Sequence, residues 1–152
     1  MSTEGLTRIS VFANRNPSLS EEEFHAHWTE KHGPLVSSWL QKHGIIRYTQ
    51  VLPPPSPTVA LTDAFQYHTP ASHGDYITQN FSIPTLSYDG VADFYVKSLE
   101  DFKEAYEDPY YEDVVKKDEE YLFDVKNMRI MVGTETRIIE GSKIVQDHSQ
   151  TK

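Results

Sequence analysis

Alternating and helically spaced apolar residues divide most of this chain into four expected strands and two expected helical regions. In the expected strands apolar and polar positions alternate, and β-branched and aromatic residues are frequent. In the expected helices apolar residues recur at spacings of three and four. The expected strands are residues 6–13, 45–51, 91–96 and 128–139, and the expected helical regions are residues 20–43 and 98–123.

The first helical region has recognisable start, interruption and stop signals. Ser20 and Glu23 form a capping-box pattern, in which the two side chains satisfy free N–H groups at a helix start. Gly33 and Pro34 predict a kink or a break, because proline lacks the backbone donor that a helix interior needs. Gly44 is placed to end the helix.

The order of elements predicts the fold class. Strand, helix, strand, long connection, strand, helix, strand is the split β-α-β pattern repeated, which is typical of an α+β ferredoxin-like plait. In the third strand Val91 and Tyr95 point to one face, and Ala92, Phe94 and Val96 point to the other, so both faces of this strand carry apolar residues. A sheet with one solvated face would not show this pattern. We therefore expect the second face to be covered, most simply by a second copy of the chain.

The remaining segments are weakly patterned. Residues 52–88 include a proline cluster that cannot pair in a sheet, and long connections of this kind are often lids or binding loops. The sequence does not decide whether this connection covers a pocket, or whether His68 and His73 then reach it. We expect one domain over residues 1–140 and a flexible polar tail over residues 141–152.

Composition narrows the classes of function. The 152 residues suit one domain, and the formal net charge of −9 disfavours nucleic acid or a membrane surface as a partner. The absence of cysteine excludes disulfides, thiolate nucleophiles and iron–sulfur clusters. Neither a signal peptide nor an apolar run of about 20 residues is present, so we expect a cytoplasmic protein. Aromatic residues make up 12% of the chain. We expect them either to line a pocket for a flat ligand or to fill the core.

Two polar side chains beside apolar helical stripes are the main candidates for acid–base chemistry. His32 lies at the edge of the first stripe, and Asp118 is the only formal charge on the apolar face of the last helix. Its charged neighbours at positions 116, 117, 119 and 120 have a solvated face available. His32 equally suits a helix end at which it bonds a backbone carbonyl, and Asp118 suits a solvated edge position or the role of a cap partner. An imidazole facing a carboxylate in an apolar pocket would instead form an acid–base pair with tunable pKa values.

Other polar residues give weaker signals. Tyr48, in the second expected strand, either orients a carbonyl group or packs with its hydroxyl at a rim. His43 suits the negative end of a helix dipole. A metal site at His25, His27 and His32 is disfavoured, because residues two apart on an α-helix point in different directions. No nucleotide, flavin or serine-hydrolase motif is present, so an enzyme of this sequence is expected to need neither metal nor organic cofactor.

Four blocks of sequence occur in order within residues 6–139: LSEEEFHAHWTEKHGPLV, WLQKHGIIRYTQ, YDGVADFYV and DPYYEDVVKKDEEYLFD. Together they resemble the EthD-domain family, most closely its fungal branch of polyketide-tailoring lyases. That branch includes decarboxylases of atrochrysone carboxylic acid and dehydratases of naphthopyrone pathways. The resemblance implies a dimeric α/β barrel, two sheets packed face to face, with a pocket between sheet and helices in each protomer. It also implies catalysis without a cofactor on a polycyclic aromatic polyketide.

The resemblance also implies which residues act. In decarboxylation of a β-keto acid, His32 or Tyr48 would donate to the ketone oxygen. In dehydration of a β-hydroxy ketone, neutral His32 would remove the α proton and protonated Asp118 would assist the departing hydroxyl. The residues expected to bind substrate are Trp28, Trp39, Phe94, Asp89 and His43.

Three functions follow from this reasoning. The leading one is a cofactor-independent lyase, a decarboxylase or dehydratase, acting on an aromatic polyketide intermediate of secondary metabolism. The alternatives are a cofactor-free anthrone-type monooxygenase and a non-catalytic polyketide-binding accessory protein. We expect a homodimer with no nucleic-acid or membrane partner.

Overall fold

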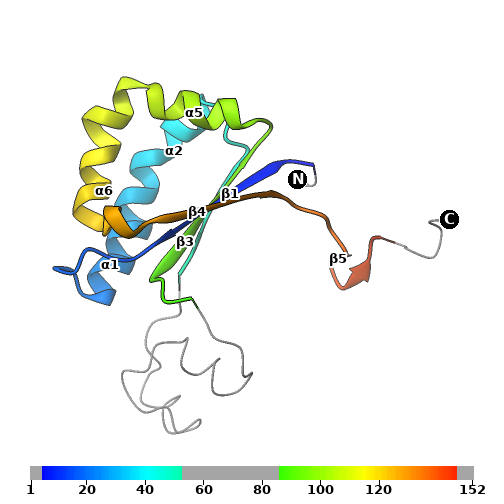
Figure 1. Cartoon of the computed structure of the whole chain (residues 1–152), viewed down its shortest axis with the longest axis horizontal. Coiled ribbons are helices and arrows are strands. Elements are labelled where there is room, and N and C mark those ends of the chain that lie inside the picture. The colour runs from blue at the N-terminus through cyan, green and yellow to red at the C-terminus, as the bar shows by residue number, and fades with distance from the viewer. Residues whose placement is uncertain (1–4, 53–85, 147–152) are drawn as a thin grey trace, which may run out of the picture.

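A computed structural model describes residues 5–52 and 86–146, and in them the main sheet is antiparallel with four strands. Its strands are β1 (Thr7–Ala13), β2 (Arg47–Val51), β3 (Gly90–Val96) and β4 (Arg129–Thr134). They lie in the order β2-β3-β1-β4. Figure 1 shows the helices gathered on one side of this sheet. The α+β ferredoxin-like arrangement is thereby confirmed, whereas the described part of the chain forms an open sheet and not a closed barrel.

The helical layer consists of two stretches in which π-helical turns join α-helical segments. The first contains α1 (Glu21–His27), η1 (Trp28–His32) and α2 (Gly33–Lys42). The second contains α5 (Leu99–Glu107), η2 (Tyr111–Val115), α6 (Lys116–Leu122) and the short 3₁₀ turn η3 (Val125–Asn127). Both stretches agree in position with the two expected helical regions.

The ends of the first stretch follow the sequence signals. The Ser20 hydroxyl accepts a hydrogen bond from the Glu23 N–H at 3.0 Å, and the Glu23 carboxylate accepts one from the Ser20 N–H at 2.8 Å. Gly44 has a φ of +76° and follows the end of α2. Of the kink or break expected at Gly33 and Pro34, the break is absent. The backbone stays helical from His32 into Gly33, and Pro34 lies in the first turn of α2. The irregularity is the π-helical turn η1 just before it.

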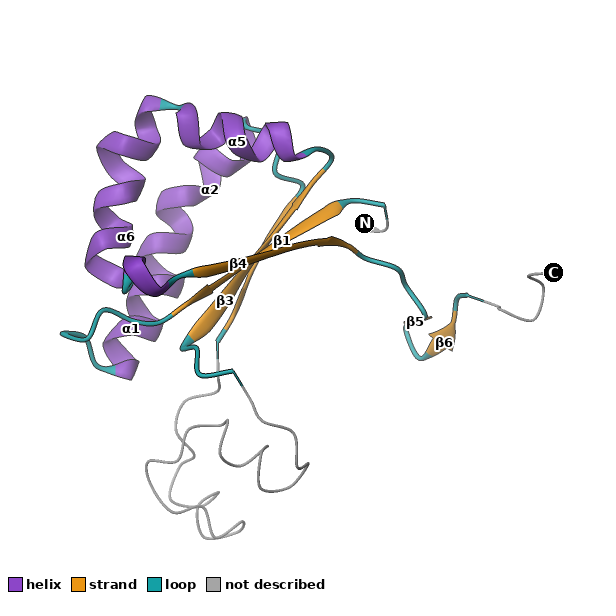
Figure 2. Ribbon diagram, viewed as in Figure 1, coloured by secondary structure: helices purple, strands orange, loops and turns teal. Residues whose placement is uncertain are grey.

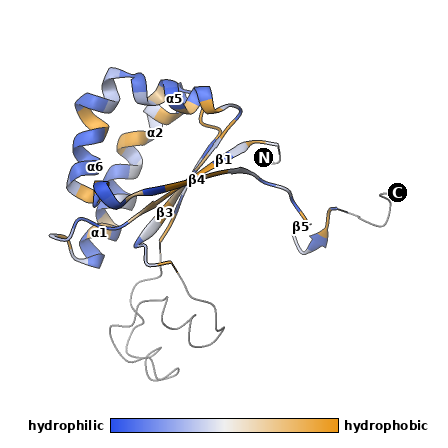
Figure 3. Ribbon diagram, in the orientation of Figure 1, coloured by the Kyte–Doolittle hydropathy of each residue, from blue (hydrophilic) through white to orange (hydrophobic). Residues whose placement is uncertain are grey.

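The core lies between the sheet and the helices. Alternate residues of β1 and β3 face the helical layer, and Figure 3 shows hydrophobic and hydrophilic positions alternating along the helical ribbons. Burial of the apolar positions supplies most of the driving force for this packing. The most deeply buried large side chains are Ile9, Phe24, Trp28, Val96, Val115 and Leu122.

The second face of the sheet is partly covered by the chain's own polar side chains. Asp93 in β3 is 2% exposed, and it accepts hydrogen bonds from the Arg8 guanidinium at 2.8 and 3.1 Å and from the Ser10 hydroxyl. The Tyr95 hydroxyl donates to Glu135 at 2.8 Å beside this pair. The apolar residues on both faces of β3 therefore gave no indication that Asp93, a buried charged residue, lies at the centre of this strand. The expected homodimer stays a prediction.

The C-terminal part of the chain differs from the expectation in detail. The fourth strand ends at Thr134, and a hairpin of β5 (Ile139–Glu140) and β6 (Lys143–Ile144) follows, so the boundary expected at residue 140 falls inside a hairpin. Figure 2 shows the hairpin apart from the main sheet. Most of the expected 52–88 connection, with His68 and His73, and the last six residues lie outside the described residues. No helix in the described ranges is long and apolar enough to cross a membrane.

Two strand glycines offer a matched test of the packing between η1 and the sheet. A Cβ added at Gly90 would lie 2.3 Å from Cζ3 of Trp28, whereas a Cβ added at Gly133 would meet nothing within 4 Å. We expect Gly90→Ala to lower the free energy of unfolding by about 1–3 kcal/mol, because an overpacked core must shift. Gly133→Ala should change it by less than about 1 kcal/mol. Urea unfolding followed by tryptophan fluorescence measures both, and equal effects would contradict this packing.

Candidate active site

The two candidate acid–base residues meet between the two helical stretches. Nδ1 of His32, at the end of η1, lies 2.7 Å from Oδ2 of Asp118 on α6. Nε2 of His27 lies 2.8 Å from the other oxygen of the same carboxylate. The His32 residue is 5% exposed, while the side chains of His27 and Asp118 are 24% and 16% exposed. One carboxylate thus holds two imidazoles, and the expected contact between His32 and Asp118 is present.

The π-helical turn η1 explains how both histidines reach one carboxylate. In an α-helix, residues five apart point about 140° away from each other. In a π-helical turn the backbone hydrogen bond spans five residues, as it does from the Gly33 N–H to the Trp28 carbonyl. His27 and His32 are therefore brought onto one side. Regular α-helical spacing does not predict His27 as a partner of Asp118.

The surroundings of His32 favour its neutral form. Burial lowers the pKa of His32, the carboxylate of Asp118 opposes this shift, and His27 adds to it. The ring of Phe123 packs edge-on against His32, with 5.8 Å between ring centroids. In the neutral ring the proton on Nδ1 is donated to Asp118, which leaves Nε2 with its lone pair. His32 is thus arranged as a base whose orientation is set by the carboxylate.

Tyr48 and Trp28 place two donors side by side between β2 and η1. Nε2 of Gln50 donates to the Tyr48 hydroxyl and to the Trp28 carbonyl oxygen, each at 3.1 Å, so the Tyr48 proton remains available for another acceptor. Burial raises the pKa of Tyr48 and keeps its hydroxyl protonated. The indole Nε1–H of Trp28 is buried near this hydroxyl, yet no group in the described ranges accepts a full hydrogen bond from it. A carbonyl oxygen is a suitable acceptor for both donors.

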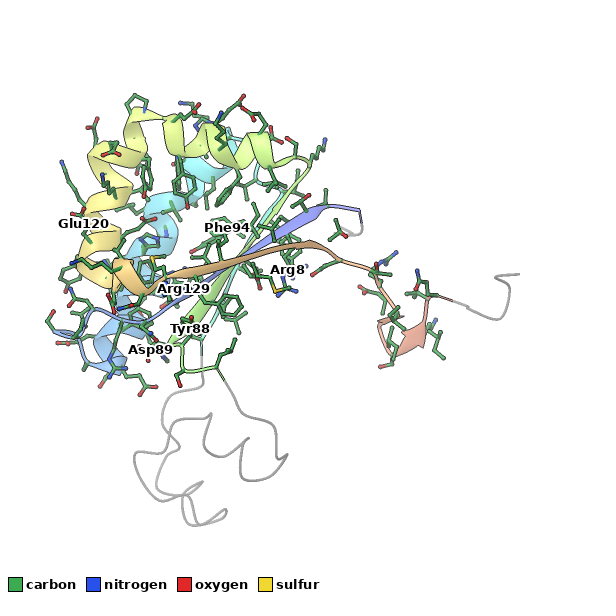
Figure 4. The ribbon with its side chains drawn as sticks, viewed as in Figure 1. Arg8, Tyr88, Asp89, Phe94, Glu120 and Arg129 are labelled. Atoms are coloured by element: carbon green, nitrogen blue, oxygen red, sulfur yellow. The ribbon has the colours of Figure 1, made fainter. Side chains whose placement is uncertain are left out.

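A wall of aromatic rings leads from Tyr48 toward α5. Phe94 lies 5.0 Å from Tyr48 and 5.2 Å from Phe102, and Phe102 lies 4.9 Å from Tyr106, measured between ring centroids. Phe102 and Tyr106 also border an open hollow of about 340 Å³ between α5 and β4. Figure 4 labels Phe94 at this wall and Arg129 at the hollow. The other residues lining the hollow are Val11, Met128, Arg129 and Ile130, so neither His32 nor Asp118 lines it directly.

The other expected substrate-binding residues have structural partners. The Trp39 indole donates to the Ala105 carbonyl at 2.9 Å, which ties α2 to α5. Asp89 accepts from the backbone and the guanidinium of Arg15, each at 2.9 Å. These contacts fix the helical layer and the entrance to β3. They leave Trp39 as a buried wall residue and do not bring Asp89 into the group around Asp118.

His43 belongs to a separate cluster at the end of α2. Its Nε2 lies 2.7 Å from Asp108, which also pairs with Lys42 at 2.8 Å and accepts from the Tyr110 N–H at 2.9 Å. These hydrogen bonds hold the pKa of Asp108 well below its ordinary value. The structure therefore gives His43 a role in joining α2 to the second helical stretch and does not bring it to His32.

Glu119 lies in a different environment from the one that its sequence position predicts. It was expected on a solvated face, but its carboxyl group is partly buried and accepts a hydrogen bond from the Tyr111 hydroxyl at 3.0 Å. Burial raises the pKa of Glu119 to about 7. The available signal was its spacing of four from Val115 and eight from Tyr111, which places it on the inward face. Within the described ranges, no group of three or more His, Asp or Glu side chains is arranged to hold a metal ion.

Comparison of the sequence with protein families and curated proteins gives consistent matches. The family model described as the EthD domain matches residues 16–126. The dehydratase aurZ of Gibberella zeae is 29% identical over 140 residues, covering 92% of this chain and 84% of the relative. A decarboxylase of Emericella nidulans is 24% identical over 149 residues, covering 95% and 86%. The relatives thus match along almost their whole length.

Solved structures share the fold at low sequence identity. An EthD family protein from Bacillus halodurans superposes with a TM-score of 0.51 at 12% identity, covering 86% of this chain and 99% of that one. A dimeric protein of ferredoxin-like fold from Bacteroides fragilis has a TM-score of 0.52 at 9% identity, covering 87% and 98%. At these identities the likeness shows the fold alone.

The contact between His32 and Asp118 can be tested by titration. Asp118→Asn removes the negative charge that opposes the effect of burial, so the pKa of His32 should fall further below its ordinary value. Asp113→Asn, an equal charge change at an exposed position of η2, should leave it unchanged. NMR titration of the His32 ring measures both variants. A His32 pKa that is unchanged or raised in Asp118→Asn would contradict the contact.

Proposed function

This chain belongs to the EthD domain family, and from that premise we propose that it is a cofactor-independent lyase acting on an aromatic polyketide by acid–base catalysis. The observation that carries the proposal is the Asp118 carboxylate holding a buried His32 by Nδ1, which leaves Nε2 as a base. Relatives named dehydratase and decarboxylase support the reaction class. The aromatic wall beside Tyr48 supports a flat substrate.

Dehydration of a β-hydroxy ketone uses these groups as follows. The ketone oxygen accepts hydrogen bonds from the Tyr48 hydroxyl and from Trp28 Nε1–H, which stabilise the negative charge that develops there. His32 Nε2 removes the proton from the carbon between the ketone and the hydroxyl-bearing carbon. Asp118 orients His32 and stabilises the imidazolium. Since imidazoles occupy both of its oxygens, Asp118 is better suited to this role than to the acid role suggested by the sequence.

Decarboxylation of a β-keto acid uses the same donors. The ketone oxygen is again held by Tyr48 and Trp28. Neutral His32 first takes the proton of the carboxylic acid. The electron pair of the breaking carbon–carbon bond then forms an enolate as carbon dioxide leaves, and the protonated His32 returns the proton to carbon. Positioned proton transfer of either kind is worth roughly 100- to 10,000-fold in rate. The geometry around His32 is compatible with both reactions.

The proposed partner is a second copy of the chain, docked on the sheet face opposite the helices. Val51 and Met131 are 54% and 64% exposed on that face, beside the ion pair of the partly exposed Arg8 and the buried Asp93. Exposed apolar side chains around a satisfied polar centre suit an interface between identical sheets.

A pair of neighbouring residues in β4 tests this interface. We expect light scattering to give the mass of a dimer for the wild type. Met131→Asp introduces a charge on the proposed interface and should give a monomer. Ile130→Asp, one residue away, faces the helical layer and should leave the dimer intact. A monomeric wild type, or equal effects of the two substitutions, would overturn the proposed assembly.

Removal of the proposed base tests the reaction. His32→Gln keeps a polar side chain without a basic nitrogen, and we expect it to lower kcat by roughly 100- to 10,000-fold. His25→Gln, on the same helix, should retain activity. The assay incubates each protein with aromatic β-hydroxy ketones and β-keto acids and detects loss of water or carbon dioxide by mass spectrometry.

The alternatives give different results in the same assay. A fully active His32→Gln variant removes the proposed mechanism. Oxygen consumption during turnover would indicate a monooxygenase, and binding of an aromatic ligand without turnover would indicate an accessory protein.

A further inference from the structure

Glu119 is an inward-facing acid that the mechanism above does not use. It follows Asp118 on α6, and its Oε2 accepts a hydrogen bond from the Tyr111 hydroxyl at 3.0 Å. In the described ranges no hydrogen bond engages its other oxygen. That oxygen is therefore available to a bound molecule.

Aromatic rings connect Glu119 with the hollow beside β4. The ring of Tyr111 lies 4.6 Å from Tyr106 and 5.8 Å from Trp39, between centroids. Tyr106 in turn borders the hollow. Glu119 also interacts electrostatically with Tyr48, so it lies near the hydroxyl group that is proposed to bind the substrate.

No cation is among the titratable groups that face Glu119 in the described ranges. Those groups are Tyr48 from β2, Tyr106 from α5, Tyr111 from η2, and Asp118 and Glu120 from α6. Burial and the two neighbouring carboxylates outweigh the stabilising hydrogen bond from Tyr111, so the pKa of Glu119 rises to about 7. A substantial fraction of Glu119 is a carboxylic acid at neutral pH.

We propose that Glu119 is a second catalytic residue, the general acid that protonates the departing hydroxyl group, and that Tyr111 positions it. The inference rests on the lyase function proposed above. It favours dehydration, because loss of hydroxide requires a proton at oxygen whereas loss of carbon dioxide does not.

The bonds and protons balance in a single elimination. His32 Nε2 takes the α proton, and the electron pair of the broken C–H bond becomes the new carbon–carbon double bond. The C–O bond breaks with its electron pair on oxygen, which takes the Glu119 proton and leaves as water. His32 is left protonated and Glu119 ionised, and proton exchange through solvent restores both. No oxidant or reductant is needed.

Glu119→Gln tests the acid directly. The amide can still accept the Tyr111 hydrogen bond but carries no acidic proton, so we expect kcat for dehydration to fall by roughly 100- to 1,000-fold with KM little changed. In the wild type only the protonated acid is active, so kcat should decline as pH rises through about 7. That decline should be absent from the residual activity of Glu119→Gln.

Glu120→Gln is the matched control. Glu120 is the next residue on α6 and is exposed, as Figure 4 shows. Its loss removes one of the charges that raise the pKa of Glu119, so the decline in kcat should shift slightly to lower pH while the maximal kcat stays near that of the wild type. Loss of activity in this variant equal to that in Glu119→Gln would overturn the specific role of Glu119.

Carbon-13 NMR of labelled glutamate separates this inference from the proposed function. The Glu119 carboxyl, identified by its absence in Glu119→Gln, should titrate with a midpoint of about 7. A midpoint in the ordinary glutamate range overturns the acid role whatever the activity. If the wild type turns over substrate and Glu119→Gln has the same kcat, the acid role alone is overturned. If the wild type has no lyase activity, the proposed function and the acid role are both overturned.

Discussion

The Asp118 carboxylate, shared between His27 and His32, is the contact on which the rest of the site depends. It joins the two helical stretches, which the Trp39–Ala105 hydrogen bond and the His43–Asp108 contact also hold together. A partly buried charged contact of this kind is expensive to desolvate and is weak evidence for stability. Its clearer consequence is chemical: it fixes the orientation of His32 and leaves Nε2 as the free nitrogen.

Two adjacent acidic residues on α6 acquire different properties from their surroundings. Asp118 lies between imidazoles, whereas Glu119 accepts a hydrogen bond from Tyr111 and interacts electrostatically with Tyr106. Successive residues on a helix point about 100° apart, so neighbours can reach different walls of one pocket. Separate environments for two carboxyl groups are a recurrent way of dividing orienting and acid roles in enzymes.

Much of the fold could be predicted from the sequence, because it depends on regular periodicity and local signals. The order of elements along the chain and the Ser20 cap followed from those patterns, and the meeting of His32 with Asp118 was one of the alternatives that they left open. The role of His27 could not be predicted, since a π-helical turn changes the spacing without changing the apolar pattern. The Arg8–Asp93 pair joins residues 85 positions apart, and Glu119 interacts with Tyr106 of α5 and Tyr111 of η2. Both depend on tertiary packing that local patterns do not report.

A double-mutant cycle on turnover tests the central claim most directly. The claim is that His32 and Asp118 act as one unit, with the carboxylate working through the imidazole. The account predicts that Asp118→Asn by itself lowers kcat strongly. In a protein that already carries His32→Gln, the same substitution should have little further effect, since effects within a unit are not additive. Independent effects, in which the two losses multiply, would contradict it.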